Sequence, residues 1–85
     1  MTYREKFHNS TDWKSKVLTM EFFHLLRLTE NKKWTMKNTA NYFGVSLALV
    51  SENLMLAVGL REGKLDDYPS RVKALEGLKN GEKQK

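Results

Sequence analysis

The chain has 85 residues, a formal net charge of +5, 40% hydrophobic residues and no cysteine. A chain of this length forms one domain with a radius of gyration of roughly 12 Å and a core too small for a deep substrate pocket. The absence of cysteine excludes disulfides, thiolate zinc sites and a cysteine nucleophile. No apolar run approaches the ~20 residues of a membrane span, and the first ten residues lack the apolar core of a signal peptide, so we expect an intracellular protein.

The first eleven residues mix charges with Tyr3 and Phe7 without a lasting hydrophobic period, so a loosely held arm is predicted over residues 1–11. Three N-capping residues then stand in a row, ending at Asp12, and predict a helix over residues 12–29. Its apolar residues recur at intervals of three and four and predict one wide inward-facing stripe. The members of that stripe are Trp13, Val17, Leu18, Phe22, Leu25 and Leu26.

Two further helices are predicted in the middle of the chain. Thr35 caps a short helix over residues 36–43, and Ser46 caps the next helix, which ends at Gly59 or continues to Gly63. The pattern does not decide between these two ends. Both helices carry apolar residues at helical spacing, so each is expected to pack one face on a shared core.

A loop over residues 64–69 follows, because the residue before a proline disfavours helix. A last helix is predicted from Arg71 to about Lys79, capped by Ser70. Its inward-facing residues are expected to be Val72, Leu75 and Leu78. Residues 80–85 are predicted to be a frayed polar tail. No segment alternates like a strand, so we expect a small all-α domain of about four helices over residues 12–79.

The segment over residues 34–60 has the pattern of a helix-turn-helix. Ala40 is small where a crossing helix must pass closely, and Gly44, four residues later, accepts the positive φ of a tight turn. A small wedge of core residues fixes the angle between the two helices, and it consists of Phe43, Val45 and Val50. In this motif the second helix lies in the DNA major groove.

This segment resembles the DNA-binding helices of ParB/KorB-type partition proteins and ParB-like phage regulators. The likeness is carried by GVS at residues 44–46, VSENLMLA at 50–57, LREGKL at 60–65 and SRVKAL at 70–75. It covers about half the chain and implies a helical domain that binds double-stranded DNA. Nothing resembles the nucleotide-handling part of partition proteins, so the resemblance implies no CTP or partition activity.

Few side chains of the presumed recognition helix are suited to contact bases. The candidates for base contacts are Ser46, Leu47, Ala48, Ser51 and Asn53. The serines and the asparagine would form hydrogen bonds, whereas Leu47 and Ala48 would touch thymine methyl groups. Residues 47–58 contain no lysine or arginine, the residues that most often contact guanine. We therefore expect modest affinity and a preference for sites that contain A·T pairs.

The positive charges lie beside the motif. Residues 31–64 contain five basic and two acidic residues, which gives this segment a net charge of +3. Their placement suits phosphates on both sides of a groove. The predicted phosphate contacts are Lys32, Lys33, Thr35, Lys37, Asn38, Arg61, Lys64, Arg71 and Lys73.

The sequence thus favours a double-stranded DNA-binding protein without catalytic residues, metal or cofactor. We expect a small transcriptional regulator, or a phage or plasmid accessory factor, in the cytoplasm of a bacterium or a phage-infected cell. The alternative is a protein-interaction adaptor in a phage or nucleoprotein assembly. It rests on Leu49, Met55 and Leu56, which cannot all face a small core and which leave apolar surface for a partner. A homodimer is also expected, because dimers that match palindromic half-sites are common for this motif.

Overall fold

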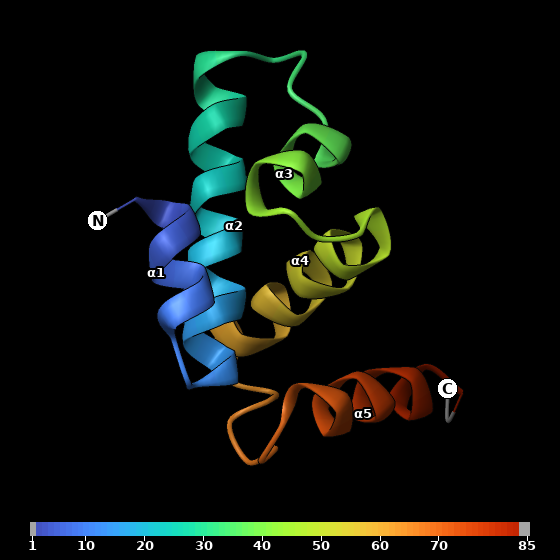
Figure 1. Ribbon diagram of the computed structural model, residues 1–85. Coiled ribbons are helices and arrows are strands. Elements are labelled where there is room, and N and C mark those ends of the chain that lie inside the picture. Colours follow the sequence, from blue (N-terminus) through green and yellow to red (C-terminus); the bar gives the residue numbers. More distant parts are fainter. Residues whose placement is uncertain (1, 84–85) are drawn as a thin grey trace.

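The computed structural model describes the backbone of residues 2–83 and the side chains of residues 2–79 (Figure 1). Its helices are α1 (Tyr3–Asn9), α2 (Trp13–Glu30), α3 (Met36–Phe43), α4 (Leu47–Arg61) and α5 (Arg71–Lys83). Within the described residues there is no strand, and the predicted all-α class is confirmed. The long helix α2 has α1 on one side and α3 and α4 on the other, while α5 lies below α4 in this view, beyond the end where α2 begins (Figure 1).

The helix α1 is the first difference from the sequence prediction, because residues 1–11 were expected to form a loose arm. Thr2 and Glu5 form a capping box at its start. Phe7 is buried, and His8 Nε2 lies 2.8 Å from the carbonyl oxygen of Phe43 at the end of α3. Seven residues are too few to show a helical period, and contacts with α2 and α3 stabilise this helix instead.

Helix α2 begins as predicted, because the Asp12 carboxylate accepts a hydrogen bond from Ser15 N at 3.2 Å. The predicted apolar stripe is largely wrong. Of its members Val17 is buried, whereas Phe22 is 58% exposed. The other exposed members are Leu18, Leu25 and Leu26. The buried face carries Met20 and Phe23 instead. Because α2 is apolar on two faces, spacing alone does not decide which one the core covers.

A buried polar contact ties α3 to α2. His24 Nδ1 lies 2.6 Å from Thr39 Oγ1, which also accepts a hydrogen bond from Trp34 Nε1 at 2.8 Å. An indole N–H only donates, so the Thr39 hydroxyl proton remains available for the neutral imidazole of His24. Burial lowers the pKa of His24 and favours that neutral form. This contact links α3 to α2 at a buried position.

Buried side chains form two clusters. The aromatic cluster contains Phe7, Met20, Phe23, Ala40, Phe43 and Val50, with Tyr3, Trp34, Tyr42, Val45, Leu49 and Leu54 packed against it. The aliphatic cluster contains Val17, Leu56, Ala57, Leu65, Ala74 and Leu75, with Trp13, Leu60, Tyr68 and Leu78 packed against it. The aromatic cluster joins α1, α2, α3 and the first half of α4. The aliphatic cluster joins the start of α2, the second half of α4 and α5.

Helix α5 differs from its prediction in two respects. Val72 was expected to face inward but is 61% exposed, because Ala74 and Leu75 form the buried face of this helix. The helix also continues to Lys83, past the predicted end at Lys79, so residues 80–83 are not the frayed tail that was expected. Residues 84–85 of that tail lie outside the described part of the chain.

Candidate nucleic-acid interface

The chain forms two helices at a sharp angle where the sequence predicted them. Thr35 Oγ1 accepts a hydrogen bond from Asn38 N at 3.2 Å and starts α3. Gly44 ends α3 with a φ of 70°, which is the left-handed conformation expected at this position. Ser46 Oγ then accepts from Leu49 N at 3.1 Å and starts α4. Three residues thus separate the helices, and the chain direction bends by 105° between them.

The small residue in α3 and the predicted core wedge lie where the pattern placed them. Ala40 is buried in the aromatic cluster, and so are Phe43 and Val50. Val45 is half-buried and packs against the same cluster. These contacts hold α4 against α3, so the angle between the two helices is set by packed side chains and by the turn at Gly44.

The first turn of α4 is presented to solvent. Ser46 and Ala48 are exposed, Leu47 is 49% exposed, and Ser51 is half-buried one turn later. In the view of Figure 1, helices α3 and α4 both begin on the right-hand side. Four of the five predicted base-contacting residues therefore lie together on an accessible surface.

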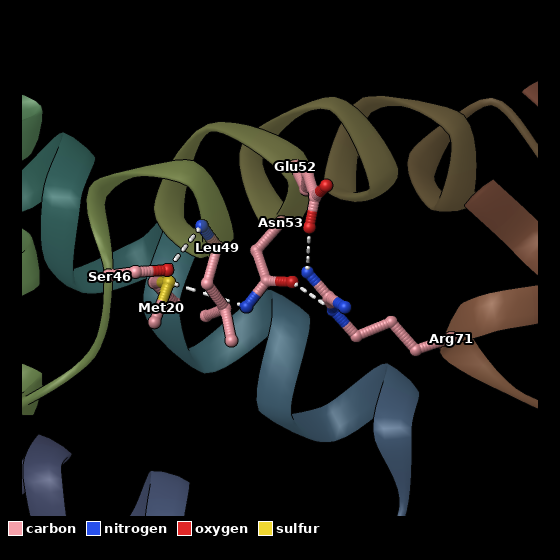
Figure 2. A network of polar contacts seen from close by, with 6 residues as sticks. All are labelled: Met20, Ser46, Leu49, Glu52, Asn53 and Arg71. Carbon is pink, nitrogen blue, oxygen red and sulfur yellow. Dashed lines mark hydrogen bonds and ion pairs between the residues drawn. The ribbon is translucent and has the colours of Figure 1, made fainter. Parts of the chain in front are cut away.

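Asn53 is the fifth predicted base contact, and it does not lie on the accessible surface. It is 2% exposed, and its side chain points into the protein (Figure 2). Asn53 Nδ2 donates to Met20 Sδ at 3.4 Å, and its Oδ1 accepts from Arg71 Nε at 2.7 Å. Both ends of the amide are thus occupied inside the fold, and Asn53 is not available to a base edge.

The predicted phosphate contacts divide into two groups. The first surrounds the start of α3 and is exposed: Lys32, Lys33, Thr35, Lys37 and Asn38. Within the described part of the chain, its three lysines have no ion-pair partner. In the second group Arg61 pairs with Glu21 at 2.9 Å, Lys64 with Glu62 at 3.4 Å, Arg71 with Glu52 at 2.7 Å and Lys73 with Glu76 at 3.9 Å. On the α3 side the predicted clamp therefore has cations without an ion-pair partner among the described residues, whereas on the other side each cation already has a carboxylate neighbour.

Two of the three residues that were expected to leave apolar surface on α4 are largely covered. Leu56 is fully buried and Leu49 packs against the aromatic cluster, which leaves Met55 at 46% exposed. Among the described helices, α2 has the most large exposed apolar side chains, and these form an apolar surface of their own. We call it the outer face of α2, and it consists of Leu18, Phe22, Leu25 and Leu26.

Arg71 forms contacts that the sequence did not predict. Its guanidinium joins α5 to Glu52 and Asn53, which lie 19 and 18 residues away in the chain. No spacing rule predicts a contact at that separation, since only the packing of α5 on α4 brings these side chains together.

No family model, curated protein or solved structure gives a significant match to this chain. Among the described helices, none is by itself both long and apolar enough to cross a bilayer. The pair α3 and α4 reaches that length and hydropathy only when taken together, across the 105° bend.

Proposed function

We propose that the protein binds double-stranded DNA as a helix-turn-helix protein, with the first turn of α4 in the major groove. The observation that carries this proposal is the 105° bend at a three-residue turn with a left-handed Gly44. Helix-turn-helix units have helices at about 90–120° joined by a short turn that often contains glycine. The role that fits is that of a small transcriptional regulator, or of a phage or plasmid accessory factor like the ParB/KorB-type proteins that the sequence resembles.

The proposed contacts with DNA are assigned to the residues that are accessible at the starts of α3 and α4. Ser46, Leu47, Ala48 and Ser51 would face base edges, and the lysines at residues 32, 33 and 37 would contact phosphates on the α3 side. The first backbone N–H groups of α3 lie at the start of this helix, beside these lysines in the chain, where an anion is favoured. The affinity would come mainly from phosphates, while the hydroxyl and methyl contacts would supply a modest preference for A·T pairs.

Fluorescence anisotropy with labelled duplexes at two salt concentrations tests the phosphate contacts. We expect Lys37→Ala to weaken binding to all duplexes alike and to lower the slope of log Kd against log salt by about one. Lys79→Ala is the matched control, because Lys79 is an exposed lysine on α5 and not on α3 or α4. Wild-type protein that binds no duplex at low salt would exclude the proposal.

A selection of bound sequences from a random duplex pool tests the base contacts. Ser51→Ala should change the preferred base at one position of the site by about 1 kcal/mol, roughly fivefold, while non-specific binding is unchanged. An identical sequence profile for wild type and Ser51→Ala would mean that this hydroxyl does not contact a base.

A second candidate function, a protein-interaction adaptor, is favoured by the outer face of α2. Phe22 is its most exposed member, and apolar side chains that cluster on a surface often mark a contact with another protein. If two copies of this chain meet there as a homodimer, Phe22→Ser should convert a dimer into a monomer in light scattering. If the wild-type protein is a monomer at high concentration, the homodimer is excluded.

A further inference from the structure

We propose that Arg71 is a positioning residue for DNA binding, which neutralises Glu52 at the edge of α4 and holds the start of α5 there. This inference rests on the proposed DNA-binding function. It replaces the earlier expectation that Arg71 contacts a phosphate. It also gives a role to α5, which lies outside the two crossed helices.

The geometry fixes the guanidinium in one position. Arg71 Nη2 lies 2.7 Å from Glu52 Oε1, and Arg71 Nε donates to Asn53 Oδ1 at 2.7 Å. Asn53 is itself anchored to Met20 in the aromatic cluster. Figure 2 shows this chain of contacts running from α2 through α4 to α5. Donation from two different nitrogens restrains the guanidinium more than a single contact would.

The negative charge of Glu52 is the reason why its pairing with Arg71 matters for DNA binding. Glu52 is the only charged side chain among residues 47–60, and it follows the exposed Ala48 by one helical turn. A carboxylate at this position would repel the phosphates of a duplex held against the start of α4. Arg71 cancels that charge with a side chain that is 27% exposed, opposite a Glu52 side chain that is 38% exposed. Because both are partly covered, salt screens the pair less than a fully exposed one.

The experiment compares wild type with Arg71→Ala, Glu52→Gln and the double variant, using anisotropy across a series of salt concentrations. We expect Arg71→Ala to weaken binding about tenfold at low salt and Glu52→Gln to tighten it by about threefold, since unit charges near phosphates have effects of this order. The double variant should return to within about threefold of wild type, because it removes both charges. Lys79→Ala is again the control for loss of a positive charge on α5.

The salt slope separates this role from a phosphate contact. If Arg71 only neutralises Glu52, the double variant keeps the wild-type slope of log Kd against log salt. If Arg71 itself contacts a phosphate, the double variant loses about one unit of slope, and the inference is wrong. Equal binding by wild type and Arg71→Ala also overturns it. Wild-type protein that binds no duplex overturns the proposed function and this inference together, whereas the other outcomes leave the proposed function intact.

Arg71→Ala also removes a hydrogen bond to the buried Asn53, so circular dichroism and thermal melting accompany each variant. Should Arg71→Ala not fold, Glu52→Gln keeps the inference testable, because it retains Arg71 and its bond to Asn53. Weaker binding by Glu52→Gln than by wild type would contradict the proposed charge effect.

Discussion

The aromatic and aliphatic clusters differ in how they are held together. In the aromatic cluster, ring pairs contact one another at 4.2–6.0 Å between centroids, and the buried contact of His24 with Thr39 adds a polar tie. In the aliphatic cluster α5 and the loop before it are held by aliphatic side chains, by Tyr68 and by Arg71. The difference shows that α3 and the start of α4 are packed on several helices through the aromatic cluster, while α5 contacts mainly α4.

The largest expected effect on stability comes from removing one buried ring from the aromatic cluster. Phe43→Ala should lower the free energy of unfolding by about 3–5 kcal/mol, since a fully buried ring leaves a cavity. Leu75→Ala in the aliphatic cluster should cost less, about 2 kcal/mol, because this residue is 9% exposed and its neighbours are able to close part of the gap. Urea denaturation followed by circular dichroism measures both. Equal losses would mean that the two halves are equally well packed.

A methyl group on Gly77 should loosen α5. An added Cβ would collide with the ring and hydroxyl of Tyr68, so Gly77→Ala should destabilise by about 1–3 kcal/mol. Glycine to alanine in a helix normally stabilises, so the sign itself is informative. Thermal melting of Gly77→Ala with and without Tyr68→Ala tests the cause. If the second substitution does not reduce the loss, the collision with Tyr68 is not its origin.

Substitution of Gly44, in the turn beside the aromatic cluster, should change the free energy of unfolding through the backbone conformation alone. Gly44→Ala should cost about 1–2 kcal/mol, because alanine disfavours a positive φ. The nearest side-chain atom to an added Cβ, Arg4 Nη2, lies at an ordinary contact distance of 3.6 Å, so no clash contributes. Denaturant titration should show a smaller loss for Gly44→Asn, since asparagine adopts the left-handed conformation more readily. Equal losses for the two variants would point to a cause other than φ.

The smallest expected effect is a pH dependence carried by His24. Burial lowers the pKa of this imidazole below its ordinary value, so the unfolded chain takes up the proton more readily than the folded one. The contribution of neutral His24 to the free energy of unfolding is therefore complete above about pH 6.5. It is lost as the pH falls from that value toward the lower pKa of His24 in the folded protein. Thermal melting between pH 7.5 and 5.5 measures it. His24→Gln should flatten this part of the pH profile, and an unchanged profile would assign it to other groups.

The sequence by itself determined the features of this protein that depend on neighbouring residues, such as the helix caps and the turn. The caps at Asp12, Thr35 and Ser46 and the left-handed Gly44 lie where they were predicted, because each depends on a few neighbouring residues. The buried Ala40 and the core wedge were also predicted correctly from the spacing of the two short helices. That these elements bind DNA stays a prediction.

Contacts between residues far apart in the chain decided the rest. The sequence did not show that α1 would fold against α2 and α3, or that α2 would bury Met20 and Phe23 and expose Phe22. It also predicted Asn53 as a base contact and Arg71 as a phosphate contact, whereas Asn53 is buried and Arg71 forms hydrogen bonds with Asn53 and Glu52. That Arg71 acts through Glu52 stays a proposal. The physical reason is the same in each case: periodicity shows which side chains share a helix face, but only the packing of other helices decides which face is covered and which charges meet.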